Sequence, residues 1–183
     1  MNRITPIVAM VACAAGTALG QPATGIWRTP DGTTVPESKS RRSIGGFGAW
    51  LVVTPDQDWS QKWETPSTVT PRFNEAKEVR LGGKVTTLIF FANPLPNSVG
   101  EVHVVCDIKV VRPNGSMSVD APNTQCMKGP LRGPPANVRL GAPVLVFVAE
   151  ANDPPGIWRV EVIVRDLVRN VAVPVRTQYT LTR

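Results

Sequence analysis

The sequence predicts an all-β protein, an antiparallel sandwich of about seven strands. Gly and Pro number 15 and 18 among the 183 residues, and so many helix breakers leave little room for long helices. Several segments alternate apolar and polar side chains with a period of two, and short turn-forming sequences separate them. The chain is 42% hydrophobic and 19% charged, so it can bury the core of one ordinary domain.

The first 20 residues have the layout of a secretory signal peptide. Arg3 supplies a positive charge, residues 4–18 are apolar or small, and Ala18-Leu19-Gly20 offers small residues for a cut before Gln21. The apolar run is too short for a membrane-spanning helix, and no second run reaches the ~18 residues that such a helix needs. We therefore expect an exported protein, periplasmic or secreted, without a membrane span.

A lipid anchor is the alternative interpretation of this terminus. Met10-Val11-Ala12-Cys13 loosely matches a bacterial lipobox, in which Cys13 would be lipidated and become the first mature residue. Ordinary cleavage would instead remove Cys13 with the signal peptide. The sequence does not decide between lipidation of Cys13 and its removal, nor between a periplasmic and an extracellular location.

Residues 21–46 are rich in Pro, Gly, Ser and Thr, with Ile26 and Trp27 as the obvious apolar anchors. We predict a flexible lead segment here and place the β-sandwich domain at residues 47–183. The segment contains the basic run Lys39-Ser40-Arg41-Arg42. We interpret this run as a solvated loop, and binding to an acidic surface is the alternative.

The first strands of the domain are strongly apolar. Phe47–Thr54 is apolar and β-branched and stops at Pro55, while Val85–Phe91 is typical of a central strand buried on both faces. Between them, Asp56–Trp63 predicts one helical turn, because Trp59 and Trp63 lie four residues apart.

A hairpin is predicted around Asn114-Gly115, a favoured pair for a type I′ turn. Residues 101–112 alternate, with Val104, Cys106, Ile108 and Val110 on one face. With Asn114 and Gly115 at the centre of the turn, Val110 faces Val119 and Ile108 faces Ala121, so both pairs are apolar. The same ladder places Cys106 opposite Asn123, next to a break at Pro122.

The carboxyl-terminal part continues the pattern of strands and turns. Residues 138–150 form a strand region in which Pro143 marks a bend or an edge. Residues 157–166 alternate cleanly, and 171–181 alternate again after a turn. These two segments predict the closing hairpin of the sandwich.

Cys106 and Cys126 remain after the expected cleavage, and a cysteine pair in an exported protein most often forms a disulfide. The closed loop of about 20 residues would contribute roughly 3 kcal/mol. Two free thiols, or a metal pair with His103, are the alternatives. One His and two Cys give too few ligands for a closed zinc site, so we expect no metal and no cofactor.

Parts of the sequence resemble Ig-like or fibronectin-type sandwiches. The resemblance lies in the closing stretch from Gly156 to Tyr179 and in the hairpin from Val104 to Ser116. The combination of Phe47-Gly48-Ala49-Trp50, Trp63-Glu64-Thr65-Pro66 and the closing hairpin is similar to uncharacterised secreted proteins of Gram-negative bacteria. The resemblance implies an Ig-like fold and brings no activity with it.

The sequence offers no constellation of catalytic residues that we can assemble. A serine hydrolase needs a base, and His103 is the only histidine. It lies on the outward face of a predicted strand, so we interpret it as a surface residue. Asp56, Asp58 and Glu64 share one loop and leave an acid pair open as the least favoured hypothesis. We therefore predict no catalytic residues and a protein that is not an enzyme.

Two groups of residues are candidates for a binding surface. Trp59 and Trp63 lie in the acidic loop, where they either pack on the sandwich or contact a sugar or partner. Arg159, Arg165 and Arg176 predict a basic stripe on the closing hairpin, suited to anionic envelope polymers. Nucleic acid is disfavoured because stacking aromatics are not interleaved with these charges.

The function expected from the sequence is that of an exported, non-enzymatic interaction module of the bacterial envelope or secreted fraction. Its partner would be an envelope protein or an anionic or glycan polymer. A carbohydrate-binding module that uses the loop tryptophans is the alternative. The sequence names neither the ligand nor the oligomeric state.

Overall fold

The computed structural model describes residues 26–29, 31–65 and 71–183. The predicted signal peptide, its cleavage site and Cys13 lie outside these residues, so the expectations about them stay predictions. Among the described residues, no helix combines the length and the apolar character needed to cross a membrane.

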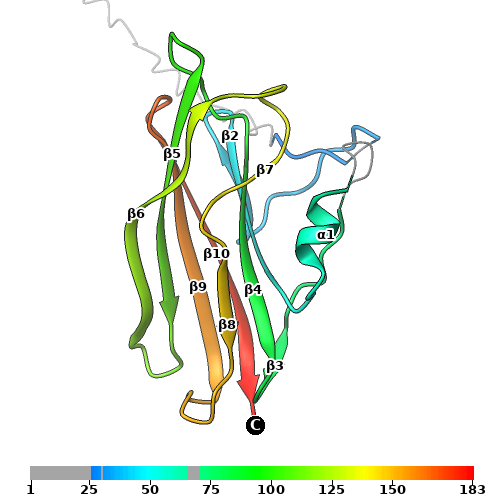
Figure 1. The fold of residues 1–183 in the computed structure, drawn as a ribbon, viewed down its shortest axis with the longest axis vertical. Helices are drawn as coiled ribbons and strands as arrows, with labels where there is room; N and C mark the ends of the chain where they lie inside the picture. Colours follow the sequence, from blue (N-terminus) through cyan, green and yellow to red (C-terminus); the bar gives the residue numbers. More distant parts are fainter. Residues whose placement is uncertain (1–25, 30, 66–70) are drawn as a thin grey trace, which may run out of the picture.

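The described chain folds into two five-stranded sheets that face one another, with one short helix outside them (Figure 1). This confirms the predicted all-β sandwich, while the Ig-like resemblance stays a prediction. The described residues form ten strands where about seven were expected, because the structure separates short edge strands from their neighbours. The elements are β1 (Arg41–Ile44), β2 (Phe47–Thr54), α1 (Trp59–Trp63), β3 (Glu78–Arg80), β4 (Lys84–Ala92), β5 (Glu101–Val111), β6 (Met117–Pro130), β7 (Arg139–Leu140), β8 (Leu145–Val148), β9 (Gly156–Asp166) and β10 (Val171–Thr182).

The first sheet is built around β4. Its order is β1-β2-β4-β7, and β8 pairs with the other end of β4. The chain between β7 and β8 contains Pro143, which has no N–H for a ladder, so the predicted strand region divides there.

The second sheet has the order β3-β10-β9-β5-β6. β9 and β10 form the predicted closing hairpin, in an unbroken antiparallel register from Val171 opposite Asp166 to Leu181 opposite Gly156. Because β3 pairs only with Thr180–Thr182, most of the outer edge of β10 is left to other parts of the chain.

The main core lies between the sheets and follows the predicted alternation. Inward side chains of β2, β4, β5, β9 and β10 meet there, and Trp158 is fully buried among them. The disulfide between Cys106 and Cys126 lies in this core, with 5.9 Å between the two Cα atoms. The predicted disulfide is confirmed.

A second, smaller core covers the outer face of the first sheet. Val52, Leu88 and Phe90 are buried there under α1 and its flanking loops. This explains why β4 is apolar from Leu88 to Ala92, and it confirms that the strand is buried on both faces.

The hairpin of β5 and β6 keeps the predicted register but forms a different turn. Val110 faces Val119 and Ile108 faces Ala121, as expected. However, the N–H of Gly115 donates to Arg112 O at 2.9 Å, and Gly115 has a φ of +85°. The type I′ prediction is therefore wrong: Pro113 and Asn114 are the central residues of a type I turn, followed by a glycine bulge. The φ of proline suits the first central position of that turn.

Bulges in β6 also change the pairing near the cysteines. Cys106 faces Thr124, not Asn123 as predicted, because Asn123 occupies a bulge with a φ of +56°. A second irregularity between Val104 and Val105 leaves Cys126 without a directly paired residue. Its side chain turns into the core beside Cys106.

The described part of the predicted lead segment is attached to the sandwich. Trp27 is 6% exposed and donates its indole N–H to Arg42 O at 3.2 Å. β1, which also lies ahead of Phe47, pairs with β2 along its whole length. The described residues before Phe47 thus correct both the predicted flexibility and the predicted domain start, because a buried tryptophan and a strand ladder hold them in place.

Candidate binding groove

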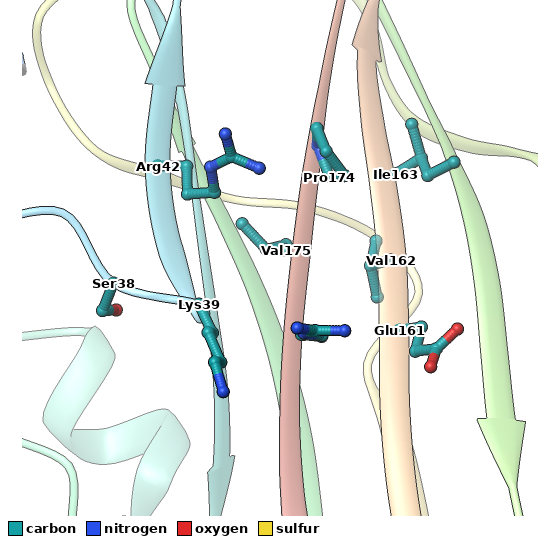
Figure 2. A pocket seen from close by; sticks show the side chains of 9 residues that line it. Ser38, Lys39, Arg42, Glu161, Val162, Ile163, Pro174 and Val175 are labelled. Carbon is teal, nitrogen blue, oxygen red and sulfur yellow. The ribbon is translucent and has the colours of Figure 1, made fainter.

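The outer edge of β10 and the segment Ser38–Arg42 enclose two adjoining hollows of about 470 and 640 Å³. Figure 2 shows Lys39 and Arg42 on one side of the first hollow, with Pro174 on β10 and Glu161 and Ile163 on β9. Ser38, Lys39, Glu161 and Arg176 line both hollows, so we treat the two as one feature, the basic groove.

One backbone hydrogen bond crosses the basic groove at the point where the hollows meet. The N–H of Arg176 donates to Lys39 O at 2.7 Å. Pro174, two residues away on the same edge of β10, has no N–H to donate. The segment ahead of β1 therefore contacts β10 at this bond without forming a ladder, and the space on either side remains open.

Positive charge dominates the described residues that line the basic groove. Four of them are cationic and one, Glu161, is anionic; the cations are Lys39, Arg42, Arg159 and Arg176. Arg176 lies directly opposite Glu161 on the neighbouring strand. Arg159 Nε is 3.8 Å from Glu161 Oε1, and both side chains are nearly half exposed, so this pair is weak. The groove keeps a net positive field.

Neutral groups complete the lining. Ser38, Ser40, Thr177 and Gln178 supply hydroxyl and amide groups, which can both donate and accept hydrogen bonds. Ile163 and Pro174 lie opposite each other on β9 and β10 and form an apolar part of the wall. The groove thus combines basic and polar side chains with a substantial apolar surface.

The structure brings together only part of the predicted arginine stripe. Arg159 and Arg176 line the basic groove, but Arg165 does not. Its Nη2 donates to Asp107 Oδ1 at 2.8 Å and to Asn123 Oδ1 at 2.6 Å. Arg165 thus ties β9 to β5 and to the bulge of β6.

The basic run of the lead segment supplies the other two cations. Lys39 and Arg42 line the groove, whereas the guanidinium of Arg41 lies over the Trp50 ring, 5.8 Å from its centroid. This basic run is evident in the sequence, and contact with an acidic surface is its alternative role there. The sequence alone could not predict that β9 and β10 lie opposite the run, because those strands are more than a hundred residues further along the chain.

The two candidate tryptophans lie in α1 and pack onto the first sheet. Trp59 and Trp63 are both partly buried against the smaller core. The ring centroids of Trp63 and Phe90 are 5.2 Å apart. This packing accounts for both residues, and their role as a contact surface stays a prediction.

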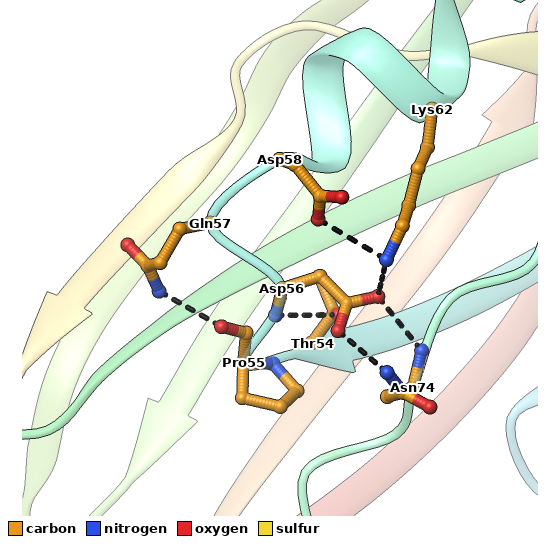
Figure 3. A network of polar contacts seen from close by, with 7 residues as sticks. All are labelled: Thr54, Pro55, Asp56, Gln57, Asp58, Lys62 and Asn74. Atoms are coloured by element: carbon orange, nitrogen blue, oxygen red, sulfur yellow. Dashed lines mark hydrogen bonds and ion pairs between the residues drawn. The ribbon is translucent and has the colours of Figure 1, made fainter.

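The acidic loop residues hold α1 in place (Figure 3). Lys62 Nζ lies 2.7 Å from Asp56 Oδ2 and 3.1 Å from Asp58 Oδ1. Asn74 donates its backbone N–H and its side-chain amide to Asp56, at 3.0 and 2.8 Å. Burial raises the pKa of Asp56, but the hydrogen bonds from Lys62 and Asn74 outweigh it and lower the pKa to about 2.

Within the described part of the chain, neither the histidine nor a cluster of metal-ligating side chains adds a candidate site. His103 lies on β5 opposite Lys128 and is partly buried. In the ranges that the structure describes, no three side chains of His, Cys, Asp or Glu are placed to hold one metal ion.

Comparison with known proteins identifies no relative by sequence. No family model matches the chain. No curated protein matches it either.

Among solved structures, the chain is similar in fold to a family 123 glycoside hydrolase from Clostridium perfringens, with a TM-score of 0.43 and 9% identity over 74% of this chain and 27% of that one. For an alkylpurine DNA glycosylase from Pseudomonas fluorescens, the TM-score is 0.41 and the identity is 14%, over 75% of this chain and 31% of that one. For a Niemann-Pick type C2 protein from the Japanese carpenter ant, the TM-score is 0.33 and the identity is 9%, over 72% of this chain and 89% of that one. The chain spans less than a third of the first two proteins, and likeness at this level supports no function.

Proposed function

We propose that the protein is an exported, non-enzymatic binding module that holds an anionic partner in the basic groove. The partner is an envelope protein or an anionic or glycan polymer. The observation that carries the proposal is the lining of the groove, where Lys39, Arg42, Arg159 and Arg176 face a single carboxylate, Glu161. A hollow with charges of mostly one sign attracts and orients ligands of the opposite sign.

The groove also suits a binding role in its rigidity. Arg159, Glu161 and Arg176 project from neighbouring positions on β9 and β10, two strands paired along their whole length. Lys39 and Arg42 are held by the bond to Arg176 and by the pairing of β1 with β2. Side chains on such a frame lose little backbone freedom when a ligand binds.

One further observation supports export, and another supports a non-enzymatic role. A buried disulfide such as Cys106–Cys126 is typical of proteins that fold in an oxidising compartment. The sequence left an acid pair open among Asp56, Asp58 and Glu64, and two of these, Asp56 and Asp58, bind Lys62 and hold α1. These contacts favour a structural role for the acidic loop.

Retention on immobilised carboxymethyl dextran, a polysaccharide with spaced carboxylates, tests the proposal. The double variant Lys39→Gln/Arg176→Gln removes two charges from the groove, and Arg80→Gln/Lys128→Gln removes two exposed charges that do not line it. We expect the groove variant to elute at clearly lower salt than the wild type, because fewer counterions are released on binding. We expect the matched control to elute near the wild type. Equal shifts in both variants would show that net charge alone matters and would overturn the proposal.

A further inference from the structure

We infer that the ligand of the basic groove is an acidic oligosaccharide, a chain of sugars with carboxylates spaced along it. This inference rests on the proposed function and deepens it. Three features of the groove support it: the length of the groove, the position of Glu161, and the neutral side chains of the lining.

The groove is too long for a single small anion. Its lining on β10 runs from Pro174 to Gln178, five residues of extended strand whose ends lie about 13 Å apart. Arg42 lines only the hollow next to Pro174, and Arg159 lines only the hollow next to Gln178. A ligand that contacts both arginines must therefore be extended and carry more than one negative charge.

The place of Glu161 disfavours a densely charged ligand. Its carboxylate lines both hollows and so lies between the cations of the two ends. A polyphosphate or nucleic acid would bring a negative charge close to it, which costs binding energy. A sugar chain with spaced carboxylates can place a hydroxyl there, and a hydroxyl donates a hydrogen bond to a carboxylate.

The rest of the lining also fits a sugar chain. Ser38, Ser40, Thr177 and Gln178 match the mixed donor and acceptor character of sugar hydroxyls. The exposed pair of Ile163 and Pro174 offers an apolar surface to the C–H face of a sugar ring.

An acidic peptide fits less well. An extended peptide that adds a strand to a sheet edge gains its affinity from main-chain hydrogen bonds. On the edge of β10, Pro174 has no N–H to donate, and the N–H of Arg176 already bonds Lys39 O. The edge that faces the groove therefore cannot form a regular ladder with a peptide.

Isothermal titration of the oxidised protein with four defined probes tests this inference. The probes are tetragalacturonate, the neutral maltotetraose, inorganic polyphosphate and tetraglutamate. We expect tetragalacturonate to bind at least about tenfold more tightly than each of the others. Arg176→Gln should weaken this binding by about tenfold through the loss of a charge-assisted hydrogen bond, and Arg80→Gln should leave it unchanged.

Glu161→Ala separates the two possible effects of the carboxylate. If sugar hydroxyls donate to Glu161, the variant binds tetragalacturonate more weakly and polyphosphate more tightly than the wild type. Tighter binding of both probes would mean that Glu161 only repels ligands, and would overturn the inference.

The remaining outcomes distinguish the inference from the proposed function. Preferred binding of polyphosphate or tetraglutamate, lost in Arg176→Gln, would overturn the sugar ligand and leave the anion-binding groove standing. If maltotetraose bound as tightly as tetragalacturonate, the ligand would not need negative charge, and the inference of an acidic oligosaccharide would be overturned. If no anionic probe binds, both the inference and the proposed function are wrong.

Discussion

Asp166, at the end of β9, is a carboxylate with no exposed surface. Its oxygens accept the backbone N–H groups of Leu95, Val168 and Arg169 at 2.8 to 3.1 Å. The side chain of Arg169 in turn donates to Gly45 O and Asn93 O, both at 3.0 Å. Arg169 Nε also lies 3.6 Å from Asp166 Oδ2. The buried carboxylate and its arginine thus connect the turn after β1, the loop after β4 and the turn after β9.

We expect Asp166→Ala to lower the free energy of unfolding by about 3 kcal/mol, because it leaves three partly buried backbone N–H groups without their acceptor and the Arg169 guanidinium without its counter-ion. Urea denaturation measures the effect. Asp120→Ala on β6, an exposed position, serves as the control and should change stability by less than about 0.5 kcal/mol. Equal stability of the two variants would contradict this role for Asp166.

Asp56 makes stability depend on acid. Its pKa falls from 3.8 to about 2 in the folded protein, so the unfolded chain binds a proton at a higher pH than the folded chain does. The resulting stabilisation, about 2 kcal/mol, is fully present above about pH 5 and is lost as the pH falls to about 2. Asp56→Asn should lack this part of the pH dependence.

Urea denaturation of the wild type and Asp56→Asn from pH 7 to pH 2 measures the difference directly. We expect a constant gap in stability above pH 5 that narrows as the pH approaches 2. Other carboxylates titrate in both proteins and cancel in this comparison. A gap that stays constant down to pH 2 would show that Lys62 and Asn74 do not lower the pKa of Asp56.

At the scale of elements, local pattern located nearly every strand. β2 matches its predicted range of Phe47–Thr54, and β9 and β10 agree with theirs to within one residue. The side-chain alternation depends only on neighbours in sequence, which is why it could be predicted. The turn at Gly115 was predicted wrongly because Pro113 can enter the turn as a central residue and Asn-Gly alone does not exclude this.

The disulfide joins β5 to β6 at a bulge, where the ladder itself is irregular. We expect Cys106→Ala/Cys126→Ala to lower the free energy of unfolding by about 3 kcal/mol, because the unfolded chain regains the freedom of a loop of 20 residues. Denaturation with and without dithiothreitol measures it. The reductant should destabilise the wild type and leave the double variant unchanged; an unaffected wild type would contradict the expectation.

At the scale of the whole molecule, the predicted signal peptide and the disulfide in the fold lead to one expectation, that the protein is exported. We expect expression in a Gram-negative host to yield a periplasmic or secreted protein that begins at Gln21, because the first 20 residues have the layout of a signal peptide. Intact mass should also show the loss of hydrogens on forming the disulfide. A mass that retains residues 1–20, or that includes a lipid on Cys13, would contradict cleavage at this site.

The sequence by itself determined the β-class, most strand positions, the register around Val110 and Val119, and the cysteine pair. Each follows from alternation or from turn chemistry within a few residues. Only the tertiary structure decided that Lys39 and Arg42 face Arg176, that Arg165 binds Asp107, and that α1 covers Phe90. The alternation of side chains indicates which face of a strand is polar or apolar. Which segment covers that face depends on packing between residues far apart in the chain.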